Sequence, residues 1–217
     1  GFSTDPASAF GGILAFNGEV ERAAAEAVSA QFLEVLIAPS YSPEAIELLA
    51  RKKNLRVIEA ERPTEPELSV RTIAGGLLVQ TSDPGGFDRD ETTVVTERQP
   101  EPSEWVDLEL AWKLAARVTS NCIVLVKDTM AVGIGAGQQN RRDAGRIAAE
   151  KAAGRAVGGA CASDAFFPFR DGLDAAAEAG ATCVVQPGGS VRDDEVIAAA
   201  NEANMAMVFT GVRHFRH

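Results

Sequence analysis

Short apolar runs alternate with segments of helical apolar spacing along the first sixty residues. The runs at 13–16, 35–38 and 55–58 predict strands. Residues 20–32 and 42–53 carry apolar positions at helical spacing, and the second helix begins at Ser42-Pro43, where serine is the cap and proline takes the first helical position. This order predicts a strand-helix-strand unit of α/β architecture.

The second half of the chain repeats this alternation. Helices are predicted at 104–118, 141–153, 173–179 and 193–201, and strands at 122–127, 130–134, 183–185 and 205–209. The strands on either side of Asp128-Thr129 are expected to pair as a hairpin. Residues 35–58 and 183–209 share the order strand, proline turn, helix, strand, which indicates an internal duplication.

Residues 59–102 break the pattern. They contain predicted strands at 73–80 and 92–96, a turn cluster at 82–86, and a connector at 98–102. We interpret this region as a surface linker between subdomains. The predicted organisation is therefore a first subdomain plus connector at 1–102 and a second subdomain at 103–217.

Composition narrows the function classes. With 217 residues and a net charge of -10, the chain can bury a core but lacks the basic face that a general nucleic-acid binder needs. No apolar run is long enough to span a bilayer, so no membrane partner is expected. The three cysteines form no CxxC pair, which favours a reducing, cytoplasmic compartment. No zinc-deaminase pattern and no Ser-His-Asp arrangement is present, and no metal site is predicted.

Residues 163–171 (SDAFFPFRD) are the most informative segment, because three phenylalanines stand directly before a predicted helix. Such aromatic side chains either bury or bind a flat ligand. A shorter echo, 5–12 (DPASAFGG), lies near the N-terminus. Two copies of one element suggest a site built between the halves of a duplication.

Three further segments are candidates for binding chemistry. The glycine-rich stretch 133–141 (GIGAGQQNR) is either an anion-binding turn at a helix start or a plain tight turn, and Arg141-Arg142 suit a phosphate or carboxylate or are solvated helix charges. Residues 187–194 (PGGSVRDD) allow close backbone approach, or serve only as a cap through Ser190. The basic tail 210–217 (TGVRHFRH) is predicted to be docked and functional rather than frayed.

These motifs, together with Ser120-Asn121 and 186–190 (QPGGS), closely resemble the transformylase part of the bifunctional purine biosynthesis proteins (AICAR transformylase and IMP cyclohydrolase). The resemblance extends over essentially the whole chain. It implies two cytidine-deaminase-like subdomains, the first N-terminally incomplete. It also implies formyl transfer from 10-formyltetrahydrofolate to the 5-amino group of AICAR in IMP biosynthesis without a catalytic metal, and a homodimer with shared active sites.

The resemblance also assigns roles to particular residues. The AICAR contacts that it implies are Gly11, Glu34, Asn121, Arg141, Phe166 and Arg213, and the folate contacts are Arg142, Asp171, Ser190 and Val191. Glu34 stands where the family usually has aspartate. Either Arg141 or Arg213 would meet the nucleotide phosphate.

One departure from the family pattern concerns catalysis. The family's Lys-His pair lies in a Lys-His-Ala-Asn-Pro-Cys-Gly motif just before the Asp-Pro-Ala-Ser-Ala-Phe segment. The pair is therefore expected upstream of Gly1, and so is the cyclohydrolase domain of the family. Because the chain starts at Gly1 without methionine, we interpret it as a fragment of a longer polypeptide.

From this departure we expect no catalytic residue within 1–217. We also expect weak or absent activity of this polypeptide alone, and a need for the upstream N-terminal segment of the same protein. The alternatives are a non-catalytic binding or dimerisation module and a deaminase-like hydrolase, against which the missing zinc ligands count.

Overall fold

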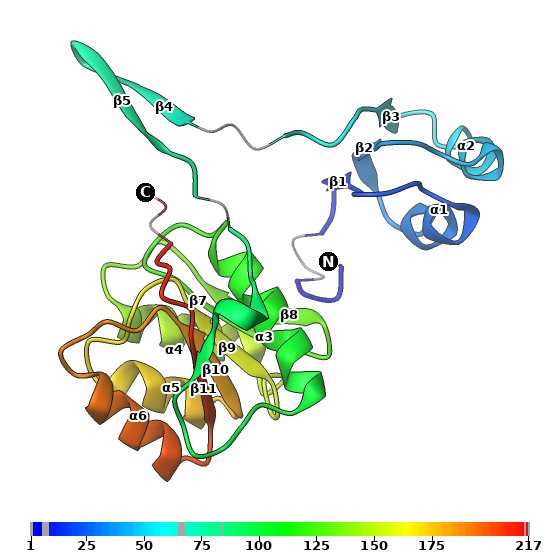
Figure 1. The fold of residues 1–217 in the computed structure, drawn as a ribbon. Coiled ribbons are helices and arrows are strands. Elements are labelled where there is room, and N and C mark those ends of the chain that lie inside the picture. The colour runs from blue at the N-terminus through cyan, green and yellow to red at the C-terminus, as the bar shows by residue number, and fades with distance from the viewer. Residues whose placement is uncertain (1, 6–8, 65–67, 84, 215, 217) are drawn as a thin grey trace. The chain divides into compact units, whose positions relative to one another are not determined.

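The computed structural model forms two compact units, Phe2–Ser82 and Asp83–His217 (Figure 1). The structure describes all residues except 1, 6–8, 65–67, 84, 215 and 217. Gly1, Phe215, His217 and residues 6–8 of the predicted N-terminal motif therefore lie outside the described residues. Among the described residues, no helix has the length and apolar character needed to cross a membrane.

The first unit contains a parallel sheet in the order β1-β2-β3. Its elements are β1 (Gly12–Ala15), α1 (Arg22–Ser29), β2 (Leu33–Ala38), α2 (Pro43–Leu49) and β3 (Arg56–Glu59). Ala25 and Val28 of α1 and Ala45 and Leu49 of α2 share one core with Leu36 of β2. Ser42 caps α2 by accepting a hydrogen bond from the Ala45 N–H at 3.2 Å, as the sequence predicted.

The opposite face of this sheet carries apolar side chains that remain exposed. Strand register places Ile13 beside Val35, and Ile37 beside Ile58. Ile13 is 68% exposed and Ile58 is 42% exposed. Parallel sheets usually bury both faces, so this open face is unusual.

A separate two-stranded ribbon follows in the chain, formed by β4 (Leu68–Ile73) and β5 (Gly76–Thr81). The prediction of one strand over 73–80 was wrong, because the chain turns at Ala74-Gly75 and pairs Ile73 with Gly76. Gly75 has φ +83°, a conformation that glycine adopts without steric cost. The apolar residues on both sides of this turn read as one continuous run.

The second unit contains a six-stranded sheet in the order β6-β11-β10-β9-β7-β8, in which β9, β10 and β11 are parallel. Its strands are β6 (Thr93–Val94), β7 (Ile123–Lys127), β8 (Met130–Gly135), β9 (Ala160–Ser163), β10 (Cys183–Gln186) and β11 (Ala206–Phe209). β7 and β8 form the predicted hairpin, and both turn residues, Asp128 and Thr129, have positive φ.

Helices cover both faces of the second sheet. They are α3 (Pro102–Ala115), α4 (Arg141–Ala152), α5 (Asp171–Glu178) and α6 (Asp193–Glu202), and a short 3-10 helix, η1 (Arg89–Glu91), precedes β6. Side chains of α3 pack on one face, against Val124 and Val185. The other three helices pack on the opposite face, against Ile123 and Val184. This three-layer arrangement confirms the predicted α/β class.

Sequence patterning missed the strand β9. Its four residues, Ala-Cys-Ala-Ser, are small and weak strand formers, and the sequence shows them only as part of a small-residue run. All four are buried, because β9 lies between β7 and β10 in the sheet. The adjoining residues 163–171 therefore start from the carboxyl end of a buried strand.

The described part of residues 83–101 belongs to the second unit and is not a linker between subdomains. β6 pairs with β11, and Thr96 is buried and accepts a hydrogen bond from the Met207 N–H at 2.8 Å. Arg98 donates to the Glu104 carboxylate at 2.7 Å. This part of the predicted connector packs with the second unit because it completes the edge of that sheet.

The assignment of cytidine-deaminase-like subdomains stays a prediction.

The Arg98–Glu104 ion pair predicts a pH-dependent stability. Burial alone would raise the pKa of Glu104, but hydrogen bonds from Arg98, Thr182 and the Glu101 N–H give a net lowering from the ordinary value of 4.5. The ionised carboxylate therefore stabilises the fold above that value, and this contribution is lost as the pH falls through the lowered pKa. We expect Glu104→Gln to reduce the free energy of unfolding by about 1–3 kcal/mol at neutral pH. In urea titrations, a difference from wild type that did not shrink toward acid pH would contradict this assignment.

Two glycines of β8 allow α4 to approach the strand closely. A Cβ at Gly133 would lie 2.0 Å from the Ala148 carbonyl oxygen, and one at Gly135 would lie 1.9 Å from the Ala144 carbonyl oxygen. The first three residues of the glycine-rich stretch are therefore the end of a strand packed on a helix, and residues 136–140 form the connection to α4. Only Gly137 has the positive φ, +64°, that favours glycine in a turn.

We expect Gly133→Ala to destabilise the second unit by about 1–3 kcal/mol or more, because the added methyl group meets backbone atoms that cannot move aside cheaply. Thermal unfolding measures this change. Gly86→Ala is the control, since a Cβ there meets nothing within 4 Å. Equal effects of the two substitutions would show that close packing on α4 is not the cause.

Candidate functional site

The adjacent arginines at the start of α4 take different directions. Asn140 caps the helix by accepting from the Asp143 N–H at 2.8 Å. Arg141 then points into the protein, with only 8% of its side chain exposed, whereas Arg142 is exposed. The predicted arginine pair is therefore divided between a buried network and an open groove.

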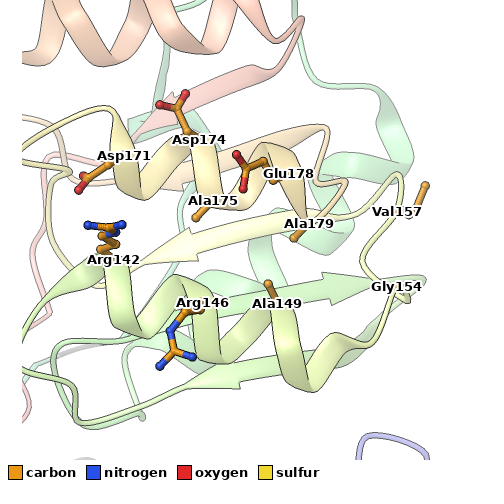
Figure 2. Close-up of a pocket in the computed structure, with 10 residues that line it drawn as sticks. All are labelled: Arg142, Arg146, Ala149, Gly154, Val157, Asp171, Asp174, Ala175, Glu178 and Ala179. Carbon is orange, nitrogen blue, oxygen red and sulfur yellow. The ribbon is translucent and has the colours of Figure 1, made fainter.

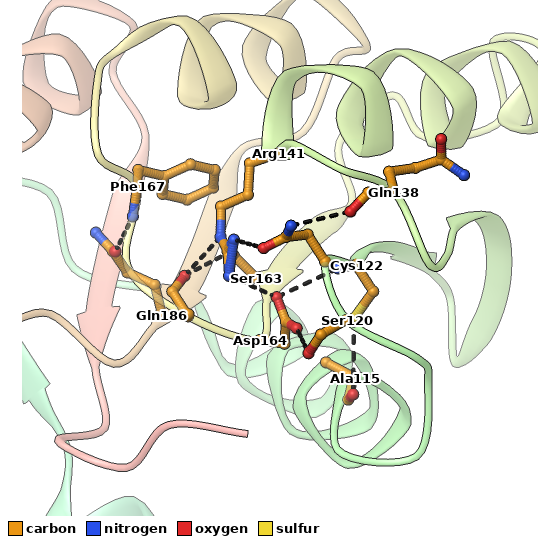
Figure 3. Close-up of polar contacts among 11 residues, drawn as sticks. Ala115, Ser120, Cys122, Gln138, Arg141, Ser163, Asp164, Phe167 and Gln186 are labelled. Atoms are coloured by element: carbon orange, nitrogen blue, oxygen red, sulfur yellow. Dashed lines mark hydrogen bonds and ion pairs between the residues drawn. The ribbon is translucent and has the colours of Figure 1, made fainter. Parts of the chain in front are cut away.

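Arg141 is held by four protein acceptors (Figure 3). Its Nη2 donates to Asp164 Oδ1 at 2.8 Å, and its Nη1 donates to Asn121 Oδ1 at 2.6 Å. Its Nε donates to Ser163 Oγ at 2.9 Å and to the Ala165 carbonyl oxygen at 3.2 Å. These contacts fix the plane of the guanidinium group at the end of β9.

Asp164 links the network to the surrounding backbone. It is fully buried, its carboxylate accepts hydrogen bonds from the Ser120 hydroxyl and from the Cys122 N–H, and its carbonyl oxygen accepts from the His214 N–H at 2.9 Å. Burial lowers the pKa of Arg141, while the Asp164 carboxylate opposes that shift. Arginine stays charged in proteins, so the two residues form a buried ion pair.

Asn121 is oriented from both ends of its amide. Its Nδ2 donates to the Gln138 carbonyl oxygen at 2.9 Å, which leaves Oδ1 to accept from Arg141. The Asn121 N–H also donates to Gln138, and the Gln138 N–H donates back to the Asn121 carbonyl oxygen. The peptide bond between Ser120 and Asn121 is cis.

The aromatic segment divides its phenylalanines between core and surface. Phe167 is fully buried, and its N–H donates to Gln186 Oε1 at 2.9 Å. Phe166 is half-buried beside Ala165, and Phe169 is 49% exposed. The burial interpretation is therefore confirmed for Phe167, whereas ligand binding by the other two rings stays a prediction.

The predicted turn 187–194 lies next to this segment. The Arg192 guanidinium carbon stands 4.6 Å from the centre of the Phe169 ring. Ser190 Oγ accepts from the Arg192 N–H at 3.1 Å, and Val191 is fully exposed. The prediction that Ser190 caps the helix was wrong, because its hydroxyl accepts from the residue before α6 and no side chain caps that helix.

A groove of about 880 Å³ runs between α4 and α5 (Figure 2). Arg142 and Asp171, both predicted folate contacts, line it and point toward each other. Arg146, Asp174 and Glu178 add further charge to its walls. Ser190 and Val191 do not line this groove and lie in the loop between β10 and α6.

The C-terminal tail is docked, as the sequence predicted. His214 is buried, its ring packs 4.4 Å from the Trp112 ring, and its Nδ1 lies 2.7 Å from Asp83 Oδ2. The Arg216 carbonyl oxygen accepts from the Ser120 N–H at 2.8 Å. These contacts place the exposed Arg213 beside the Arg141 network, close enough for its charge to lower the pKa of Arg141.

In the first unit, Gly11 and Glu34 lie side by side. A Cβ at Gly11 would be 3.7 Å from Glu34 Oε1, and Gly11 has φ +74°. The Gly11 N–H donates to the Phe32 carbonyl oxygen at 3.0 Å, and Glu34 is exposed on β2. The Phe10 and Phe32 rings stand 4.8 Å apart next to this pair.

The cysteines offer no nucleophile. All three are buried and free, and burial raises the pKa of the Cys161 thiol to about 12 and that of the other two thiols further above the ordinary range. Within the described part of the chain, no cluster of three or more His, Cys, Asp or Glu side chains could hold a metal ion.

In a comparison with protein-family models, residues 1–151 match the model of the AICARFT/IMPCHase bienzyme. This chain belongs to the AICARFT/IMPCHase bienzyme family. The family is a bienzyme of purine biosynthesis with transformylase and cyclohydrolase activities. The resemblance recognised in the sequence is thereby confirmed.

The family match covers some of the predicted site residues and not others. Gly11, Glu34, Asn121, Arg141 and Arg142 lie within residues 1–151. The roles of Phe166, Asp171, Ser190, Val191 and Arg213 rest on the motifs of the C-terminal part. All ten assignments stay predictions.

The position of the catalytic pair also stays a prediction. The sequence placed the family's Lys-His pair upstream of Gly1, and Gly1 itself lies outside the described residues. The structure therefore tests neither where that pair would stand nor whether a further segment precedes it.

Sequence reasoning did not single out Asp164 as a functional position, although it lay inside the aromatic segment. Its importance follows from burial and from three parts of the chain that bond to it, namely the start of α4, the residue before β7 and the tail. The sequence offers one signal for such an ion-pair partner. It is an aspartate that directly follows a run of small residues, in a chain that also has an arginine at the start of a helix.

Removing the Arg141 charge should expose the dependence of the fold on this network. We expect Arg141→Met to lower the free energy of unfolding by about 3–5 kcal/mol, because Asp164 is left buried without its partner. Urea unfolding measures the loss. The double variant Arg141→Met/Asp164→Asn should recover part of it, and a double variant with strictly additive losses would show that the two residues are not coupled.

Proposed function

We propose that this chain forms part of a transformylase site that transfers a formyl group from 10-formyltetrahydrofolate to AICAR. One observation carries the proposal, namely the hydrogen-bonded network of Asn121, Arg141 and Asp164, whose arginine feels the charge of Arg213. The family membership supports it, because transformylase is one of the two activities of the bienzyme. A homodimer with shared sites is part of the same proposal.

Arg141 is suited to orient the nucleotide rather than to neutralise its phosphate. Its charge is compensated by Asp164, and its four hydrogen bonds to protein leave one N–H on each of Nη1 and Nη2 for a ligand. The exposed Arg213 then meets the phosphate dianion. Phe166 offers its half-buried ring to the imidazole of AICAR.

The groove between α4 and α5 is the proposed folate region. The Asp171 carboxylate can accept two hydrogen bonds from an amino-pyrimidinone edge, and Arg142 and Arg146 suit the carboxylates of a glutamyl tail. Ser190 and Val191 would contact the folate from the neighbouring loop. No metal takes part in the proposed reaction.

The proposed chemistry needs a base, because the AICAR amine must lose a proton as it attacks the formyl carbon. His214 is buried against Trp112 and engaged by Asp83, so it is not placed to take this role. We propose that the Lys-His pair of the family motif, upstream of Gly1, supplies the base. A missing positioned base typically costs about 100- to 10,000-fold in rate.

The second candidate is a module that binds the same ligands without turnover. The docking of the tail and the compensated Arg141 favour it, since both stabilise a binding surface and neither performs proton transfer. A transformylase assay separates the two candidates. Formyl transfer by a chain that includes the upstream motif favours the enzyme, and binding without transfer by that longer chain favours the module.

Binding tests the nucleotide assignment directly. We expect Arg213→Ala to weaken AICAR binding by about 2 kcal/mol, or roughly 30-fold, because a charge-assisted contact to phosphate is lost. Isothermal titration calorimetry measures the affinity. Arg216→Ala is the matched control, since its contact with Ser120 uses the backbone carbonyl oxygen, which alanine keeps. Equal losses in the two variants would reject a specific phosphate contact of Arg213.

A further inference from the structure

We propose that Gln186 is a positioning residue, which holds the two proposed ligand sites, for AICAR and for folate, against one shared point of the fold. The identity of the two ligands rests on the proposed function. The geometry of the shared point comes from hydrogen bonds and packing within the second unit.

Gln186 is a buried amide at the end of an apolar strand. It follows Cys183, Val184 and Val185 in β10, and it is fully buried. β10 lies between β9 and β11, in the interior of the sheet. Burying an amide costs free energy unless its polar groups are hydrogen-bonded. The hydrogen bonds of Gln186 therefore indicate why a polar side chain occupies this position.

The side chain of Gln186 makes one strong hydrogen bond. Its Oε1 accepts from the Phe167 N–H at 2.9 Å, which leaves Nε2 to donate to the Met207 sulfur at 3.3 Å. A thioether sulfur is only a weak acceptor. An apolar side chain at this position would avoid the cost of burying an amide, but it would leave the Phe167 N–H buried without a partner. The bond to Phe167 is therefore the contact that requires a glutamine.

This bond fixes the aromatic segment near its centre. The Phe167 nitrogen belongs to the planar peptide unit that follows Phe166, so its direction sets the backbone from which the half-buried Phe166 ring projects. The Phe167 ring itself lies in the core cluster that α4 and α5 share. Gln186 therefore determines where Phe166, a proposed AICAR contact, stands relative to the sheet.

The Phe167 ring also connects the starts of α4 and α5. A Cβ at Gly172 would lie 2.7 Å from this ring and 3.9 Å from the Cβ of Arg141. The glycine thus lets the ring lie directly against the first turn of α5, close to the point where Arg141 leaves α4 (Figure 3). Arg141 is a proposed AICAR contact and Asp171 a proposed folate contact, so one anchored ring sets the distance between the two sites.

The backbone of Gln186 anchors the C-terminal tail as well. The Thr210 N–H donates to the Gln186 carbonyl oxygen at 3.0 Å, which continues the pairing of β10 with β11 into the tail. Arg213, the proposed phosphate contact, follows three residues later. One residue therefore joins the aromatic segment 163–171 to the basic tail 210–217. A shared anchor of this kind predicts that both ligands lose affinity together when it is removed.

Three substitutions separate positioning from general stability. Gln186→Met keeps an unbranched side chain of similar volume but removes the oxygen acceptor. Gln186→Glu keeps an oxygen at the same reach. Met207→Leu removes only the partner of Nε2 and leaves the bond to Phe167 in place. Circular dichroism checks that each chain is folded, and urea unfolding measures its stability.

Hydrogen exchange in the ligand-free chain measures the anchor itself. We expect the Phe167 N–H to exchange at least about tenfold faster in Gln186→Met than in the wild type, and at nearly the wild-type rate in Met207→Leu. Nuclear magnetic resonance follows this single amide, and the Val185 N–H in the same strand is the reference. A Phe167 rate in Gln186→Met that is unchanged relative to this reference would overturn the proposal.

Isothermal titration calorimetry then measures the affinities for AICAR and for 10-formyltetrahydrofolate. We expect Gln186→Met to weaken both by about tenfold, Gln186→Glu to recover most of that loss, and Met207→Leu to bind as the wild type does. A merely structural role predicts instead that affinity falls with the free energy of unfolding, whichever residue is changed. Equal losses in Gln186→Met and Gln186→Glu, or the loss of one ligand only, would reject the positioning role.

The two readouts distinguish this inference from the proposed function. A wild type that binds neither ligand, together with faster Phe167 exchange in Gln186→Met, supports the anchor and rejects the proposed transformylase site. Binding of both ligands by the wild type, with no change in Gln186→Met, supports the site and rejects the positioning role of Gln186.

Discussion

The buried ion pair between Arg141 and Asp164 is the interaction on which the rest of the second unit depends. A charge removed from water is stable only when it is paired and fully hydrogen-bonded, so both residues must be held by surrounding groups. The start of α4, the end of β9, the entry to β7 and the C-terminal tail therefore meet at one point. The same requirement places Asn121 and the Ala165 carbonyl oxygen next to the guanidinium.

The elements that the sequence predicted share a strong periodic signal. The repeated strand-helix units of the first sixty residues have apolar positions at clear spacing, and α2 begins at a recognisable serine cap. β9 lacks such a signal, because its residues are small and only weakly hydrophobic. They are buried because neighbouring layers cover both faces of the strand. The role of Gly133 and Gly135 was equally hidden, since it depends on how closely a helix approaches from elsewhere in the chain.

The candidate site shows the same division between motif and geometry. Motifs identified Asn121, Arg141 and Arg213 as a set, and the structure places them together in the second unit. Motifs could not tell that Arg141 is compensated while Arg142 faces a groove, because adjacent residues at a helix start differ in direction by about 100°. The ion-pair partner Asp164 was equally invisible, since pairing across 23 positions is a tertiary contact.

The two sheets suggest how the proposed duplication can be judged. β1-β2-β3 and β9-β10-β11 are both parallel, in sequential order and joined by helices. Right-handed crossovers produce this order in many α/β proteins, so the order by itself does not establish a duplication. The face of each sheet that the connecting helices leave uncovered is more informative. In the second unit α3 buries it, whereas in the first unit Ile13 and Ile58 leave the equivalent face apolar and exposed. A sheet that evolved to face water would carry polar residues there, so the aliphatic side chains indicate a face built to be covered by a layer like α3.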